Sequence, residues 1–145
     1  MYPAYLYSSN MKWTIRRQKA ELDQVTFILR GLKNEDWKVR QDAVVRIGSL
    51  DDPRILADLI KRGQHEKWYI REMIAAGIRS ISNPLLAEPM KKALSNGDDC
   101  IRDACARSLG LMRCREAEHL LEKAVADPDC RVRKTARMSL ELIRQ

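Results

Sequence analysis

The stretch WKVRQDAVVRIGSL, residues 37–50, returns three times along the chain in recognisable form. Its copies are WYIREMIAAGIRSI (68–81), DCIRDACARSLGLM (99–112) and CRVRKTARMSLELI (130–143), each starting 31 residues after the one before. A period of about 20 to 50 residues held over most of a chain is typical of stacked supersecondary units. The sequence therefore predicts a repeat protein.

The apolar residues of each copy have helical spacing. In the first copy, Val39, Ala43, Ile47 and Leu50 fall on one side of a helix at about 100° per residue. The equivalent positions of the other copies are also apolar: Ile70, Ile74, Ile78 and Ile81; Ile101, Cys105, Leu109 and Met112; Val132, Ala136, Leu140 and Ile143. Each copy is expected to be a helix with one buried stripe.

A second, shorter helix is expected after each of the first three copies. Asp52-Pro53 and Asn83-Pro84 each join an N-cap residue to a proline, which the first turn of a helix tolerates. These second helices are expected at 53–61, 85–94 and 115–126. The predicted fold is all-α, a right-handed α–α superhelix of 31-residue helix pairs.

The repeat also divides the chain. Residues 1–10 hold three tyrosines and a proline without helical spacing, and we expect them to form a flexible arm. Residues 11–145 are expected to be a single domain, because each repeat buries its core against its neighbours. Its parts are a cap at 11–34, repeats at 36–66, 67–97 and 98–128, and a terminal half-repeat at 129–145.

Charge is unevenly distributed along the chain. The formal net charge is +7, but residues 34–130 sum to −1, whereas 1–33 and 131–145 sum to +4 each. A neutral body does not favour a continuous basic stripe that follows a phosphate backbone. The sequence has no run of about 18 uncharged apolar residues, as a membrane helix needs, and its N-terminus lacks the pattern of a secretory signal. We therefore expect a cytoplasmic protein without membrane contact.

Residues that carry chemistry are sparse. No two cysteines have CxxC spacing, and neither His65 nor His119 shares a column with a nucleophile. Reduced thiols are expected at all four cysteines, namely Cys100, Cys105, Cys114 and Cys130. The sequence predicts no catalytic residue, no metal and no cofactor, and hence a protein that is not an enzyme.

The repeat has a recognisable consensus. The first copy reads Asp36, Arg40, Ala43, Ile47-Gly48 and Asp52-Pro53 in order. Later copies carry the same unit as Asp98, Arg102 and Leu109-Gly110, and as Asp129, Arg133, Ala136 and Leu140. Over about residues 20–145 this unit resembles the HEAT-like repeats of the phycobilisome-lyase type.

The resemblance implies two structural features. Aspartates and arginines would form a ladder between successive repeats, which Lys67 would interrupt, with Glu66 as a substitute. The helices that begin at 37, 68, 99 and 130 would line a concave groove. The partner-binding residues expected on that concave face are Trp37, Lys38, Gln41, Asp42, Trp68, Tyr69, Glu72, Met73, Asp103, Arg107, Arg131 and Lys134.

This surface suggests a function. Trp37 and Trp68 share one column, with Tyr69 and Met73 beside the second, and large apolar side chains outside the core are typical of a binding surface. Packing of each indole on the neighbouring repeat is the competing explanation. We expect a scaffold, adaptor or assembly factor that binds a segment of another protein. The oligomeric state is left open, including an end-to-end contact through the last helix.

Other functions are less favoured. Trp37, Trp68 and Asp42 weakly resemble the concave site of HEAT-like alkylpurine DNA glycosylases, so nucleic acid is the less favoured partner. A subunit of a bilin-lyase-type complex is another alternative. The His-Glu metal pairs of HEAT-like deoxyhypusine hydroxylases are absent, because Gln41-Asp42 and Glu72-Met73 occupy the first two of those places.

Overall fold

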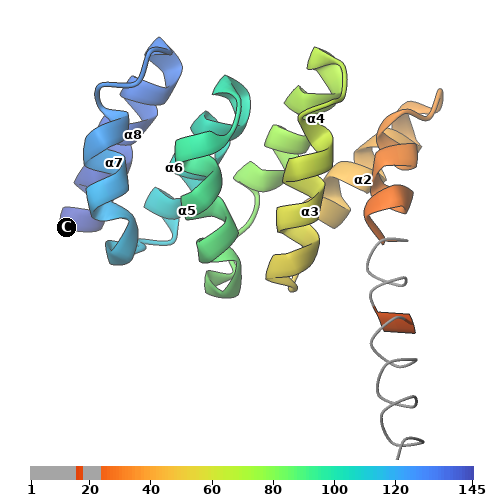
Figure 1. Ribbon diagram of the computed structural model, residues 1–145, viewed down its shortest axis with the longest axis horizontal. Helices are drawn as coiled ribbons and strands as arrows, with labels where there is room; N and C mark the ends of the chain where they lie inside the picture. The colour runs from red at the N-terminus through yellow and green to blue at the C-terminus, as the bar shows by residue number, and fades with distance from the viewer. Residues whose placement is uncertain (1–15, 18–23) are drawn as a thin grey trace, which may run out of the picture.

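The computed structural model describes residues 16–17 and 24–145, and every regular element in these ranges is helical. The helices form a row of antiparallel pairs in two layers, which Figure 1 shows in chain order. One layer contains the even helices, α2 (Trp37–Gly48), α4 (Trp68–Arg79), α6 (Asp99–Leu111) and α8 (Cys130–Arg144). The other contains the odd helices, α3 (Pro53–Gly63), α5 (Ala87–Asn96) and α7 (Glu118–Ala124). The predicted all-α solenoid is confirmed.

The even helices keep the period of the sequence, because their first residues are 37, 68, 99 and 130. Asp36, Asp98 and Asp129 cap α2, α6 and α8 by accepting hydrogen bonds from backbone N–H groups of the first turn. Lys67 stands in the same place before α4 and provides no side-chain cap. The aspartate column of the sequence is therefore a column of helix caps with one gap.

The odd helices begin as expected after Asp52 and Asn83, whose side chains cap them ahead of Pro53 and Pro84. Two of them differ from the prediction because short 3₁₀ turns, η1 (Pro84–Leu86) and η2 (Arg115–Ala117), precede α5 and α7. The Leu86 N–H bonds to the Asn83 carbonyl, three residues back, at 3.0 Å. The third odd helix also ends earlier than predicted, at Ala124.

The arm predicted at 1–10 lies outside the described residues, as do residues 11–15 and 18–23 of the cap. The described part of the cap is helical over 24–32, and it buries Val25, Ile28, Leu29 and Leu32. No helix in the described ranges combines the length and apolar character needed to cross a membrane.

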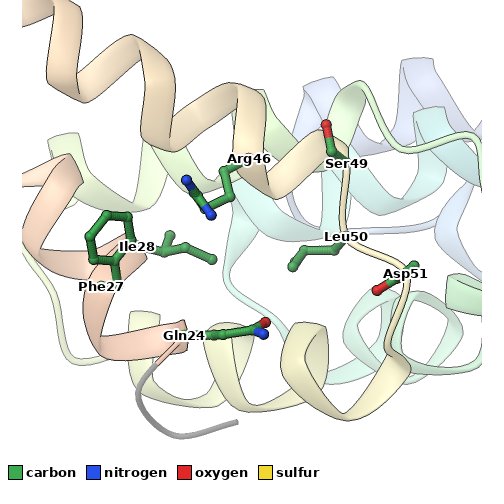
Figure 2. Close-up of a pocket in the computed structure, with 7 residues that line it drawn as sticks. All are labelled: Gln24, Phe27, Ile28, Arg46, Ser49, Leu50 and Asp51. Carbon is green, nitrogen blue, oxygen red and sulfur yellow. The ribbon is translucent and has the colours of Figure 1, made fainter. Parts of the chain in front are cut away.

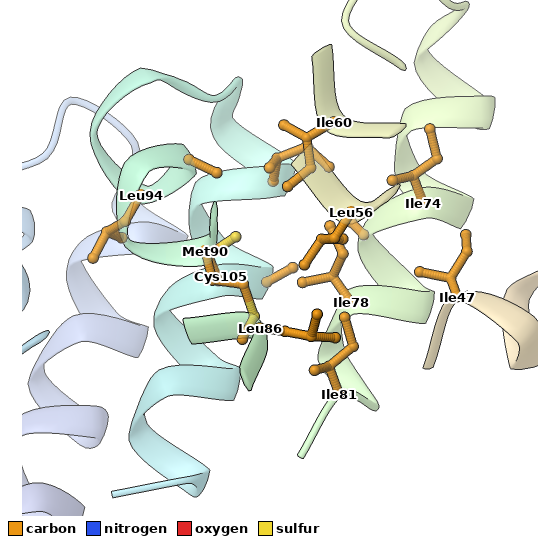
Figure 3. Packing of buried hydrophobic residues seen from close by; sticks show 14 of the residues in the cluster. Ile47, Leu56, Ile60, Ile74, Ile78, Ile81, Leu86, Met90, Leu94 and Cys105 are labelled. Carbon is orange, nitrogen blue, oxygen red and sulfur yellow. The ribbon is translucent and has the colours of Figure 1, made fainter. Parts of the chain in front are cut away.

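The predicted stripes form one continuous core. Ala43, Ile74, Cys105 and Ala136 are all buried, and Figure 3 shows how Ile74, Ile78 and Cys105 meet side chains of the odd helices. Val39 is an exception, because it is 36% exposed whereas Ile70 is 1% exposed. Among the described residues only the cap helix, 24–32, packs on this flank of α2, where Gly31 contacts Ala43 while Val39 stays partly exposed.

The even helices pack closely through small residues. A Cβ on Gly77 would lie 2.5 Å from the Cβ of Ile47, and one on Gly110 would overlap Ser139. The Ser108 hydroxyl donates to the Ile78 carbonyl at 2.6 Å, and the Ser139 hydroxyl donates to the Ala106 carbonyl at 2.7 Å. Helices α4, α6 and α8 therefore pack closely on the even helix before each of them, α4 through Gly77 and the other two through hydroxyl hydrogen bonds to backbone carbonyls.

The turn after α6 has an unusual backbone. Arg113 has φ of 53° and is the one non-glycine residue with positive φ among those described. Its N–H bonds to the Gly110 carbonyl, and the Cys114 N–H bonds to the Leu109 carbonyl, each at 3.0 Å. This is the Schellman pattern, in which the left-handed position usually holds glycine.

Candidate interaction face

We call the outward side of the even layer the even-helix face. It comprises Trp37, Lys38, Gln41 and Val45 on α2; Trp68, Tyr69, Glu72 and Ala76 on α4; Asp99, Arg107 and Leu111 on α6; and Cys130, Arg131, Lys134 and Met138 on α8. These residues lie opposite the core stripe of each helix, as the sequence predicts from helical geometry.

Aromatic side chains dominate the N-terminal ends of α2 and α4. Trp37 is 67% exposed and Trp68 is 69% exposed, so packing on a neighbouring repeat covers little of either indole. The ring of Tyr69 meets that of Trp68 edge to face, with 5.9 Å between centroids and 90° between planes. This contact gives Trp68 a defined orientation while leaving most of it open to solvent.

The remaining predicted residues of α2 and α4 divide into two groups. Lys38, Gln41 and Asp42 are exposed, as predicted for a contact surface. Met73 is only partly buried but packs against the hydrophobic core, and Glu72 is half-buried beside Arg131. Met73 is therefore largely a core residue, and the aromatic cluster consists of Trp37, Trp68 and Tyr69.

The prediction that Asp103 lies open on the face is wrong. Asp103 is 9% exposed and accepts a hydrogen bond from the Thr135 hydroxyl at 2.5 Å. Arg79 approaches it from the other side at 3.5 Å. A helical wheel places Asp103 outward on its own helix, but it does not account for the side chains of α4 and α8 that reach over it. Cys100 and Ala104 on the same helix are also buried.

Arg131 links three even helices. Its guanidinium lies 3.2 Å from Asp99 on α6 and 3.7 Å from Glu72 on α4. Neighbouring helices are about 8 to 10 Å apart, so a straight row would hold α4 and α8 too far apart for these side chains to pair easily. The contact indicates that α4 and α8 lean together over α6, which places the even helices on the inner side of the solenoid.

The part of the even-helix face formed by α6 and α8 is cationic and apolar. Arg107 and Lys134 are exposed, as predicted, and neither makes an ion pair within the described part of the chain. Leu111 and Met138 beside them are 59% and 55% exposed. The predicted site left out both of these apolar residues and Val45, although the helical projection alone places them on this face.

The arginine column forms a partial ladder between repeats. Arg102 makes a two-pronged bond to Asp127, with both N–O distances at 2.9 Å, and Arg71 lies 3.2 Å from Asp98. Burial raises the pKa of Asp127, but hydrogen bonds from Arg102 and the Asp129 amide outweigh it, and the pKa lies below its ordinary value.

The ladder is interrupted at Lys67, as the resemblance implied. Arg40 bonds instead to the carbonyl oxygens of Asn34 and Glu35, each at 2.8 Å. Glu66 does not substitute for the missing aspartate, because its partner is Lys33 at 2.7 Å.

Asp98, Asp99 and Cys100 bring oxygen and sulfur atoms within 4.8 Å of one another. The Cys100 thiol donates to Asp98 at 3.0 Å, and burial together with this bond raises the pKa of Cys100 to about 12. A thiol binds metal only as the thiolate, so this pKa works against coordination. The carboxylates already face Arg71 and Arg131. The group is a helix cap.

A hollow of about 510 Å³ opens beside Phe27, between the cap helix and α2. Figure 2 shows its lining: Gln24, Phe27, Ile28, Arg46, Ser49, Leu50 and Asp51. Phe27 is 62% exposed, with the Arg46 guanidinium carbon 5.0 Å from its ring centroid. The sequence analysis missed this hollow. Arg46 could have indicated this hollow. The equivalent positions of the later even helices are Gly77, Ser108 and Ser139, small residues that allow close packing, whereas an arginine does not.

These features define a helical repeat solenoid with an exposed aromatic surface on its inner layer. A family model of HEAT repeats matches residues 25–109, more than half of the chain. The chain therefore belongs to the HEAT-repeat family. No curated protein matches it.

Proposed function

We propose that this HEAT-repeat protein is a non-enzymatic adaptor or assembly factor that holds a segment of another protein against its even-helix face. HEAT repeats generally mediate protein–protein interaction. The particular type, phycobilisome-lyase-like, and the cytoplasmic location remain predictions.

One observation carries the proposal: two tryptophans occupy equivalent positions on neighbouring helices and are more than two-thirds exposed. Single exposed apolar residues are ordinary on protein surfaces. Here Trp37 and Trp68 are the first residues of neighbouring even helices, and the ring of Tyr69 contacts that of Trp68. Tryptophan and tyrosine are the residues on which binding energy in protein interfaces concentrates, because each buries a large area with little loss of side-chain freedom.

The charge pattern of the face favours protein over nucleic acid. On this face Arg131 is paired with Glu72 and Asp99, and Lys38 on α2 is separated from Arg107 and Lys134 by helix α4, so the remaining cations do not form a continuous row for phosphates. A protein that follows a nucleic-acid backbone uses several lysines and arginines, and its affinity falls steeply with salt.

The test is affinity capture from the native host at two salt concentrations. Trp68→Ala combined with Tyr69→Ala should lower recovery of a protein partner by at least about tenfold, because aromatic anchors of an interface often contribute 2 kcal/mol or more. Leu85→Ala is the matched control, because Leu85 is also 67% exposed but belongs to η1, outside the even layer. Recovery that is unaffected by the double change, or nuclease-sensitive material that is lost at moderate salt, would contradict the proposal.

A further inference from the structure

Two exposed apolar side chains, Leu111 on α6 and Met138 on α8, flank the contact between these helices. Gly110 on α6 and Ser139 on α8 are in such close contact that a Cβ on Gly110 would overlap Ser139. Leu111 and Met138 adjoin these two residues in sequence, and both are more than half exposed on the same side of the layer. They form an apolar surface that the protein's own core does not use.

Each apolar side chain has a cation one helical turn before it. Arg107 precedes Leu111 by four residues on α6, and Lys134 precedes Met138 by four on α8. Residues four apart lie on the same face of a helix. Because Met138 follows Arg107 by 31 residues, it lies beside Arg107 in the stack, and Arg107, Leu111, Lys134 and Met138 form a staggered group across α6 and α8, which we call the cation–apolar patch.

The acids nearest this patch are already engaged. Asp103 is held by Arg79 and Thr135, and Asp99 pairs with Arg131. Glu141 is the remaining acid of α8, and the neighbouring Arg137 on the same helix offsets it. Because Arg107 and Lys134 have no ion-pair partner in the described ranges, the patch offers positive charge beside apolar surface.

We propose that the cation–apolar patch binds a protein segment in which carboxylate side chains adjoin large apolar ones. This inference rests on the proposed function and names the chemistry of its partner. The carboxylates pair with Arg107 and Lys134, and the apolar side chains cover Leu111 and Met138.

The observations disfavour two other occupants. A second copy of this chain has a net charge of +7 and basic ends, so it repels a cationic patch. A nucleic-acid backbone provides charge for the two cations, but it has no reason to cover Leu111 and Met138.

The test uses fluorescein-labelled twelve-residue peptides and fluorescence anisotropy. One peptide has leucine at every third position and glutamate elsewhere, and the other has lysine in place of glutamate. Leucines three residues apart in a polyproline II conformation point to the same side and are about 9 Å apart, close to the spacing of α6 and α8. The full chain should bind the glutamate peptide and leave the lysine peptide unbound.

Variants locate the binding. Arg107→Ala with Lys134→Ala should weaken the glutamate peptide about five- to tenfold, as expected for two exposed ion pairs. Leu111→Ala with Met138→Ala should weaken it by a similar factor. The matched control is Lys61→Ala with Lys92→Ala, which removes two exposed cations from the odd helices α3 and α5 and should leave binding unchanged. Circular dichroism checks that each variant keeps its fold.

Each contrary result has a definite meaning. Equal binding of both peptides, an equal loss in the control pair, or tighter binding of a single-stranded oligonucleotide would overturn the inference. A native partner that is lost with Trp68→Ala and Tyr69→Ala, yet retained with Arg107→Ala and Lys134→Ala, overturns this inference alone. A partner retained by both pairs overturns the proposed function as well.

Discussion

Helices α2 and α6 are equivalent helices of two different repeats, yet they have different surroundings. Within α2 only Ala43 and Ile47 are buried, and the described chain before it provides only the short cap helix, 24–32, to pack against one side. Helix α6 lies between α4 and α8 and buries polar Asp103 and Ser108 in addition to its core stripe. The comparison teaches that position along the solenoid decides how much of a repeat becomes core and how much stays available for a partner.

The largest expected difference concerns the core. Leu109→Ala, at a fully buried position of α6, should lower the free energy of unfolding by about 2 to 5 kcal/mol through loss of apolar contact and creation of a cavity. Gln41→Ala, at an exposed position of α2, should change it by less than about 0.5 kcal/mol. Urea unfolding followed by circular dichroism measures both. Equal effects would mean that the assignment of faces is wrong.

Close helix packing gives the next contrast. Gly110→Ala places a Cβ against Ser139, including its backbone Cα, and should destabilise the protein by about 1 to 3 kcal/mol. Gly48→Ala on α2 meets the Cβ of Ser80 at 2.9 Å, at the end of α4, where a small shift relieves the contact. Alanine also gains about 1 kcal/mol of helix propensity, so the Gly48 variant should stay within about 1 kcal/mol of the parent. Thermal melts of the two variants check this order.

Acid should weaken α6 through the Arg102–Asp127 pair. The pKa of Asp127 is lower in the folded chain than its ordinary 3.8, so the pair stabilises the fold above pH 3.8. This contribution is lost as pH falls from 3.8 through the lower folded value. Asp127→Asn should therefore reduce the slope of unfolding free energy against pH in that range. Asp42→Asn on α2 is the control, because Asp42 is exposed and makes no ion pair in the described chain.

The smallest effect is expected at the turns that end the two helices. Arg113→Gly after α6 should stabilise the protein by up to about 1 kcal/mol, because φ of 53° strains any residue with a side chain. Ser49→Gly after α2 should give no gain, because Ser49 has an ordinary φ of −100°. A stabilised Ser49 variant would show that loop freedom rather than backbone strain governs these turns.

The sequence predicted most of what happens inside one repeat. Spacing alone placed Ile74, Ile78 and Leu109 in the core, and Asp52 and Asn83 at helix starts, because both depend on residues a few positions apart. Helical geometry also placed Trp37 and Trp68 outside the core.

Contacts between repeats were harder to predict. Asp103 is buried by Arg79 and Thr135, which lie 24 residues before it and 32 after it. The hollow at Phe27 depends on how the cap helix and α2 pack against each other, which the repeat pattern does not encode. A repeat pattern predicts which residues of a helix face away from the core. It does not predict whether side chains of the neighbouring helices cover those residues.

The central claim is that a protein partner lies on the even-helix face. A photo-cross-linking amino acid placed at position 41, an exposed position of the even-helix face, tests this in living cells of the native host, with the same group at position 85 as the control. We predict a protein cross-link at 41 and none at 85, abolished in the presence of Trp68→Ala and Tyr69→Ala. A cross-link at 85 alone, or none at either position while a partner still co-purifies, would contradict the claim.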